Sequence, residues 1–123
     1  MAKILIVENE FTSRDLMARM LRHIGHEVEM AESLAAAKAV CSRFTPHVAI
    51  IDWMYDDEFI GRDVAAMVRQ ICPDVRIIIA SALQPWTVKD QIADTPVSSW
   101  LVKPIEFAVL RRTLDRLAED QCA

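Results

Sequence analysis

Polar side chains that could carry phosphoryl or metal chemistry follow several aliphatic runs of this sequence. These side chains belong to Glu8, Asn9, Asp52, Ser81 and Lys103. Carboxylate and amide oxygens are ligands that a hard cation such as Mg²⁺ prefers in proteins. A hydroxyl group and an ammonium group donate hydrogen bonds to phosphoryl oxygens. The residue types therefore indicate a site for Mg²⁺ and a phosphoryl group, if the fold brings these side chains together.

Short aliphatic runs alternate along the chain with longer stretches of helical periodicity. The runs cover residues 3–7, 27–31, 47–52, 76–80 and 99–102. The interiors of the first, third and fourth runs are apolar throughout, which is typical of parallel strands that helices cover on both faces. The second run alternates between apolar and polar residues, which predicts an edge strand with one exposed face.

Apolar residues at helical spacing predict a helix after each strand. We expect the first helix to stop at Gly25, the second to begin after the cap Ser33 and the third to end at Pro73. The fourth should lie between Pro85 and Ala93, and the fifth should run from about Ile105 to Ala118. This order predicts an α/β fold of the (βα)₅ type. Its sheet is doubly wound, five-stranded and parallel, with the flavodoxin-like strand order 2-1-3-4-5. An eight-stranded barrel would need about twice this length.

The carboxyl ends of the predicted strands should form the functional edge of the sheet. Ligands of open parallel sheets bind beyond these ends, in the crevice where the strand order reverses. In the predicted order, this crevice lies between the first and third strands. Glu8 and Asn9 follow the first strand, Asp52 ends the third, Ser81 follows the fourth and Lys103 follows the fifth. We therefore expect these side chains to converge on one site.

The composition limits the classes of protein to which the chain could belong. Its 123 residues favour a single domain, and 53% hydrophobic with 26% charged residues are typical of a globular protein. The formal net charge of −4 argues against a nucleic-acid-binding surface, and no apolar run approaches the roughly 20 residues of a membrane span. Three cysteines without metal-type spacing indicate reduced thiols and a cytoplasmic protein. Cys41 and Cys72 occupy apolar helical positions and are expected in the core.

Four segments resemble the receiver domain of two-component response regulators, of the single-domain chemotaxis type. They read ILIVENE, HVAIIDW, IIIASA and WLVKPI, and the resemblance extends over essentially the whole chain. It implies one receiver domain across residues 1–123, without an output domain, that works alone in a phosphorelay. Such a protein is a phosphoacceptor that assists its own phosphorylation and dephosphorylation, and is not an enzyme in the usual sense. It signals by phosphorylation-dependent docking to a protein target that the sequence does not name, with no nucleic acid or membrane as partner.

The resemblance implies a role for each residue at the expected phosphorylation site. Asp52 accepts the phosphoryl group, as an aspartyl phosphate, from a histidine kinase or a histidine phosphotransfer protein. Glu8, Asn9, the Asp52 carboxylate and the backbone carbonyl of Met54 hold Mg²⁺.

The resemblance also implies how phosphorylation changes the protein surface. The Ser81 hydroxyl turns inward to bind the phosphoryl group, and Lys103 pairs with a phosphoryl oxygen. Trp100 falls where the family has its rotameric switch aromatic, and the Lys103–Pro104 peptide bond is implied to be cis. A homodimer through the fourth helix, the fifth strand and the fifth helix is an open alternative.

The chain departs from the family pattern around the expected metal site. Asn9 stands where most receivers carry a second acidic residue, so we expect a lower Mg²⁺ affinity. Glu10 lies one position further along and is expected to start a helix. The segment after Asp52 is one residue longer than usual before Gly61, which is expected in the turn preceding the third helix. The acidic residues Asp56–Glu58 in this segment form either a solvated loop or a replacement for the missing charge.

Other functions compete with that of a receiver. A degenerate receiver would bind its partner without phosphorylation; Asn9 favours this alternative slightly, whereas Asp52, Ser81 and Lys103 argue against it. A Mg²⁺-dependent phosphohydrolase with an aspartate nucleophile would place a second aspartate where Met54 stands. A flavodoxin-like FMN-binding protein would need a phosphate-cradling loop after the first strand, where the acidic sequence ENE would repel the phosphate.

Overall fold

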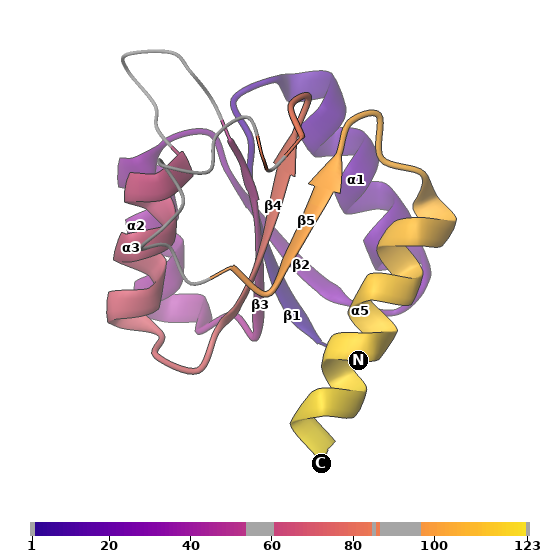
Figure 1. Ribbon diagram of the computed structural model, residues 1–123. Coiled ribbons are helices and arrows are strands. Elements are labelled where there is room, and N and C mark those ends of the chain that lie inside the picture. Colours follow the sequence, from indigo (N-terminus) through magenta and orange to yellow (C-terminus); the bar gives the residue numbers. More distant parts are fainter. Residues whose placement is uncertain (1, 54–60, 85, 87–96, 123) are drawn as a thin grey trace.

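A computed structural model describes residues 2–53, 61–84, 86 and 97–122 of the chain (Figure 1). The elements are β1 (Lys3–Val7), α1 (Phe11–His23), β2 (Glu27–Ala31), α2 (Leu34–Phe44), β3 (Val48–Asp52), α3 (Gly61–Ile71), β4 (Arg76–Ser81), β5 (Ser99–Val102) and α5 (Phe107–Cys122). The helix predicted between Pro85 and Ala93 falls outside the described residues, since Trp86 alone is described in that range. In the part of the chain that is described, no helix is long and apolar enough to cross a membrane.

The strands form one parallel sheet in the order β2-β1-β3-β4-β5. Helices α2 and α3 cover one face of this sheet, and α1 and α5 cover the other (Figure 1). The ends of β1, β3, β4 and β5 lie within one residue of their neighbours, since Val7 pairs with Ile51, Asp52 pairs with Ala80 and Ser81 pairs with Val102. The predicted fold class and strand order are confirmed, and the nearly level strand ends create one edge on which polar side chains can meet.

Two apolar clusters fill the space between the sheet and its helices. Leu5 and Val7 belong to the cluster with α2 and α3, whereas Ile4 and Ile6 belong to the cluster with α1 and α5. Successive side chains of a strand point to opposite faces, so a strand covered on both faces must be apolar at every position. This requirement explains why the interior of β1 is continuously aliphatic.

The two cysteines predicted in the core are confirmed there. Cys41 of α2 and Cys72, which follows α3, are both buried and free. Burial, together with the neighbouring Cys72 thiol, raises the pKa of Cys41 to about 11. The Cys41 thiol is therefore protonated at neutral pH and contributes to packing as a small apolar side chain.

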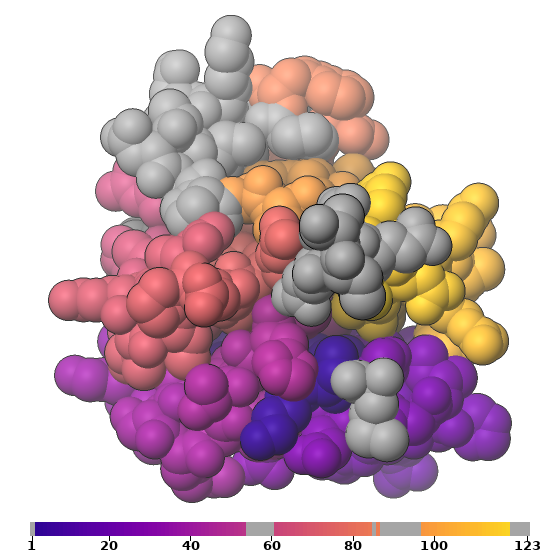
Figure 2. All heavy atoms as spheres, turned by 90° about the horizontal axis from the view of Figure 1, so that it is seen from below, coloured from indigo at the N-terminus to yellow at the C-terminus, as the bar shows by residue number. Residues whose placement is uncertain are grey.

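Two histidine rings anchor β1 at the end opposite the polar edge. The backbone N–H of Ala2 donates to Nδ1 of His26 at 3.0 Å, and that of Lys3 donates to Nδ1 of His47 at 3.1 Å. Figure 2 shows this face, where indigo atoms at the start of β1 lie between the purple and magenta atoms of later segments. Each Nδ1 accepts a hydrogen bond, which a protonated imidazole cannot do. The two histidine rings therefore hold the beginning of the strand that leads to Glu8, and the ring of His26 does so in its neutral form.

Acidification should weaken the anchor at His26. Burial lowers the pKa of His26 below its ordinary value of 6.5, so the folded protein binds this proton less readily than the unfolded chain does. The stability that depends on the neutral ring is present above the unfolded-state pKa and is lost as the pH falls through the folded-state pKa. We expect the melting temperature of His26→Asn, whose amide accepts a hydrogen bond without titrating, to depend less on pH between about pH 7 and pH 5. Equal pH slopes for His26→Asn and the wild type would contradict this role of His26.

Candidate functional site

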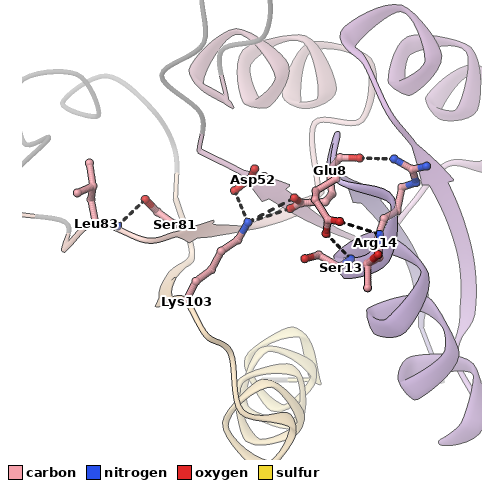
Figure 3. Close-up of polar contacts among 9 residues, drawn as sticks. Glu8, Ser13, Arg14, Asp52, Ser81, Leu83 and Lys103 are labelled. Atoms are coloured by element: carbon pink, nitrogen blue, oxygen red, sulfur yellow. Dashed lines mark hydrogen bonds and ion pairs between the residues drawn. The ribbon is translucent and has the colours of Figure 1, made fainter.

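Four polar residues meet at the carboxyl edge of the sheet (Figure 3). Glu8 directly follows β1, Asp52 ends β3, Ser81 ends β4 and Lys103 directly follows β5. Sheet-like hydrogen bonds extend past the strands, because Glu8 N–H donates to the Ala31 carbonyl at 3.1 Å and Lys103 N–H donates to the Ser81 carbonyl at 2.6 Å. These bonds continue the parallel register to the residues that bear the functional groups.

A single ammonium group lies between the two carboxylates of this edge. Nζ of Lys103 is 2.8 Å from Oδ1 of Asp52 and 3.1 Å from Oε2 of Glu8. The two acidic residues are buried, with Glu8 3% and Asp52 8% exposed. A buried carboxylate is costly without a cation, so the shared ammonium compensates both charges. Two carboxylates and one ammonium leave the site with a net charge of −1 when all three are ionised.

Burial and charge shift the protonation of this site in opposite directions. Burial, followed by the charge of Asp52, raises the pKa of Glu8 above 4.5, although the Lys103 ammonium opposes this rise. Burial alone would lower the pKa of Lys103, but the hydrogen bond and charge of Asp52, and then those of Glu8, outweigh it and raise that pKa above 10.5. Lys103 is therefore cationic at neutral pH and remains available to oxygen anions.

The two carboxylates suit a divalent cation, since both already face one positive charge. Mg²⁺ in proteins commonly uses one or two carboxylates and keeps several waters. Asn9 is exposed beyond Glu8, and the Met54 carbonyl and residues Asp56–Glu58 lie outside the described residues. The described residues contain no group of three or more His, Cys, Asp or Glu side chains that could hold a metal ion. Glu8 and Asp52 thus form a partial donor set that an amide, a carbonyl or water must complete.

Glu10 caps α1, which confirms the prediction that it starts a helix. Its carboxylate oxygens accept hydrogen bonds from the N–H groups of Thr12 at 3.1 Å and Ser13 at 2.6 Å. The bonds from Ser13, and then those from Thr12, lower the pKa of Glu10 to about 2. Its carboxylate is therefore committed to the helix terminus, where negative charge also complements the helix dipole.

Arg14 braces the backbone of Glu8, a contact that the sequence analysis missed. Nη1 of Arg14 donates to the Glu8 carbonyl at 2.7 Å (Figure 3). The guanidinium also lies 5.5 Å from the centroid of the exposed Phe11 ring. The available signal was an arginine in the first turn of the helix that follows β1. Its contact orients the bend that directs the Glu8 side chain towards Lys103.

Ser81 and Trp100 are linked through the backbone of Leu83. The Leu83 N–H donates to Oγ of Ser81 at 3.0 Å, and Nε1 of Trp100 donates to the Leu83 carbonyl at 3.0 Å. Figure 3 shows the Ser81 hydroxyl directed towards Leu83. A change at the Ser81 hydroxyl can therefore reach Trp100 through one residue. Directly after β5, the Lys103–Pro104 peptide bond is cis.

Trp53 packs directly behind the site and was also missed from the sequence. Its ring centroid lies 5.7 Å from that of Trp100, and its side chain is buried with no hydrogen-bond partner for Nε1 among the described residues. A Cβ on Gly61 would lie 2.8 Å from the Asp52 carbonyl oxygen and 3.0 Å from Cα of Trp53. Gly61 is the first residue of α3, whereas the sequence predicted it in the turn before this helix. Only a residue without Cβ permits so close an approach to Asp52 and Trp53.

A family model for the response regulator receiver domain matches residues 4–115. The chain belongs to this family. RegA of Rhodovulum sulfidophilum, a photosynthetic apparatus regulatory protein, is 28% identical over 103 residues, which are 84% of this chain and 56% of RegA. NtrC of Azospirillum brasilense, a DNA-binding transcriptional regulator, is 25% identical over 94% of this chain and 24% of NtrC. The receiver chain therefore spans 56% of RegA and 24% of NtrC, less than two thirds of either relative.

Solved receiver structures share the fold along almost the whole chain. The chemotaxis protein CheY4 of Vibrio cholerae is 26% identical with a TM-score of 0.85, over 94% of this receiver and 98% of CheY4. A two-component response regulator from Clostridium difficile has a TM-score of 0.89 at 13% identity, over 100% of both chains. TrrA of Thermotoga maritima, solved in complex with Mg²⁺ and BeF, has a TM-score of 0.81 at 24% identity, over 95% of this chain and 99% of that chain.

Removing the shared ammonium should destabilise the receiver more than removing a surface ion pair. Lys103→Met would leave Glu8 and Asp52 facing each other without their cation, at an expected cost of about 1–3 kcal/mol at neutral pH. Arg19→Met is the matched control, because its 2.9 Å pair with Asp15 is largely exposed, and it should cost less than about 0.5 kcal/mol. Urea unfolding measures both free energies.

Lowering the pH should then recover part of the loss in Lys103→Met. The pKa of Glu8 is already raised, and without the ammonium it should rise further, so protonation relieves the repulsion as the pH falls towards that pKa. If Lys103→Met and Arg19→Met lost equal free energies of unfolding, and Lys103→Met recovered none of its loss at about pH 5.5, Lys103 would not neutralise this site.

Proposed function

We propose that this receiver accepts a phosphoryl group on Asp52 from a histidine kinase or a histidine phosphotransfer protein and then signals by docking to a protein target. The observation that carries this proposal is the buried Asp52 carboxylate held 2.8 Å from the Lys103 ammonium at the carboxyl edge of the sheet. Membership of the receiver family supports the same role. The protein is a signalling phosphoacceptor that assists its own phosphorylation and dephosphorylation.

The proposed transfer uses the Asp52 carboxylate as the nucleophile. A carboxylate oxygen of Asp52 forms the new bond to phosphorus, and the bond from phosphorus to the donor nitrogen breaks with its electron pair on that nitrogen. The carboxylate and the phosphoryl group repel each other, so the reaction needs positive charge between them. Lys103 supplies one such charge, and its ammonium has three N–H donors for Asp52, Glu8 and a phosphoryl oxygen.

Mg²⁺ is the cofactor that we propose for this site. Glu8, Asn9, the Asp52 carboxylate and the Met54 backbone carbonyl would hold it. When bound, the ion supplies a second positive charge for the phosphoryl oxygens. Glu8 and Asp52 have the oxygen donors that such an ion requires, and both are already oriented towards a shared cation.

Ser81 and Trp100 are the residues that we propose to report phosphorylation to the surface. The Ser81 hydroxyl now accepts a hydrogen bond from Leu83 N–H, and it could instead donate its own proton to a phosphoryl oxygen. That turn would remove the acceptor of Leu83 N–H, while the Leu83 carbonyl is the acceptor of the Trp100 indole. The Leu83 backbone would then no longer be held in place by Ser81. The Trp100 side chain, which donates to the Leu83 carbonyl, would change its position at the surface.

A receiver that binds its partner without phosphorylation is the second candidate function. The amide of Asn9, in place of an acidic residue, favours it. The grouping of buried Asp52 and Ser81 with the partly exposed Lys103 favours phosphorylation. Protein partners, a cytoplasmic location and action without an output domain stay predictions. So does a homodimer through the fourth helix, β5 and α5, because the fourth helix lies outside the described residues.

Phosphorylation should label Asp52 alone. Incubation with acetyl phosphate and Mg²⁺ should add about 80 Da, the mass of one phosphoryl group, and the gain should be absent from Asp52→Ala. Asp15→Ala is the control, because Asp15 is a carboxylate of α1 that pairs with Arg19 away from this site. Intact-protein mass spectrometry measures the gain. Labelling of Asp52→Ala would refute the assignment, and an unlabelled wild type would favour the phosphorylation-independent receiver.

A third carboxylate should strengthen the proposed metal site. Asn9→Asp should tighten Mg²⁺ binding by roughly 1 kcal/mol, or about fivefold, the scale of one added charge contact at an exposed position. Without the metal, the same change should lower the melting temperature, because three carboxylates would then share one ammonium. Mg²⁺ titrations and thermal melts with and without the ion measure both effects. Unchanged affinity would mean that Asn9 does not lie at the metal.

A further inference from the structure

A largely apolar cavity of about 440 Å³ opens beside the candidate phosphorylation site. Leu16 and Met20 of α1 line one side of it, and Pro104 and Ile105, between β5 and α5, line the other. The volume falls within the range of small-molecule sites in proteins. A ligand of this size would therefore lie between α1 and the segment that follows Lys103.

One end of the cavity adjoins the candidate phosphorylation site through two of its residues. Glu8 and Lys103 line the cavity and also form the ion pair with each other. Nζ of Lys103 lies 2.8 Å from the Asp52 carboxylate. A molecule with an anionic group at Lys103 and an apolar group between the walls would thus place its anionic group next to Asp52.

The cavity wall exposes apolar surface that a ligand could cover. Leu16 is 55% exposed although it lies on the same helix as buried Met17, which also lines the cavity. Covering a methylene group contributes about 0.8 kcal/mol, or about a fourfold change in affinity. The flexible thioether of Met20 can adjust to groups of different shape. An uncharged hydrocarbon group fits this wall, while the Glu8 carboxylate disfavours a second negative charge on the ligand.

We propose that this cavity receives the acyl group of small acyl phosphates, so that the receiver takes phosphoryl groups preferentially from donors with an apolar acyl chain. The inference rests on the proposed role of Asp52 as phosphoacceptor. An Asp52 oxygen forms a bond to phosphorus, and the bond between phosphorus and the acyl oxygen breaks. The acyl carboxylate leaves with the electron pair, so the step exchanges one acyl phosphate for another and needs no further proton or electron.

Two donors with similar leaving groups test this proposal. Acetyl and butyryl phosphate differ by two methylene groups, and butyryl phosphate should label the wild type with about fifteenfold higher efficiency at low donor concentration. Intact mass against time, at fixed Mg²⁺ and several donor concentrations, measures the efficiency. The gain should appear as a lower half-saturating concentration, because the acyl contact aids binding and does not alter the bond that breaks.

Substitutions in the cavity wall locate the effect. Leu16→Asn and Met20→Gln should reduce the preference for butyryl phosphate to about threefold or less, because they should slow labelling by butyryl phosphate more than labelling by acetyl phosphate, whose acyl group has a single methyl group. Leu34→Asn is the matched control, because Leu34 is 39% exposed on α2, which covers the other face of the sheet. This control should retain the full preference.

The outcomes separate this proposal from the proposed function. Equal efficiencies of the two donors in the wild type would overturn the acyl cavity while leaving Asp52 as phosphoacceptor. A preference that survives in both cavity variants would overturn it as well. An absence of labelling with either donor would instead refute phosphorylation of Asp52, and the acyl cavity would fall with it.

Discussion

One ammonium group shared by two buried carboxylates is the interaction on which the rest of this site depends. Lys103 reaches Asp52 and Glu8, and the three residues come from the ends of three different strands. Because β4 lies between β3 and β5 in the sheet, the cation must extend past a strand to reach its partners. The long and flexible lysine side chain can do this. The ends of β1, β3 and β5 must therefore stay in register for the charges of the site to balance.

The surrounding backbone is fixed at the points where the acidic side chains leave it. Arg14 holds the Glu8 carbonyl, and the Glu10 carboxylate caps the helix that begins immediately afterwards. On the other side, Gly61 lets α3 approach the Asp52 carbonyl so closely that a Cβ would collide with it. These contacts hold the two carboxylate-bearing residues close together despite their repulsion. A rigid frame of this kind suits a site whose charge is proposed to change during signalling.

The proposed response to phosphorylation follows from the hydrogen bonds that Ser81 and Trp100 make to Leu83. One backbone residue provides the donor for the Ser81 hydroxyl and the acceptor for the Trp100 indole. Trp53, which directly follows Asp52, packs against Trp100 from within the core. The residue that follows the proposed phosphoacceptor therefore packs against the half-buried indole, and Ser81 is linked to the same indole by hydrogen bonds through Leu83. Such contiguous contacts are the physical means by which a local change of charge reaches a distant surface.

The sequence by itself determined the order of the strands and the residues at their ends, because continuous aliphatic runs and helical periodicity are local patterns. Lys103 and Glu8, which are 95 positions apart, could be assigned to one edge on that basis. Only the tertiary structure decided that one ammonium serves two carboxylates, that Arg14 holds the Glu8 carbonyl and that a cavity adjoins the site. These features depend on distances between side chains of separate elements. Packing sets those distances, and no spacing along the chain encodes them.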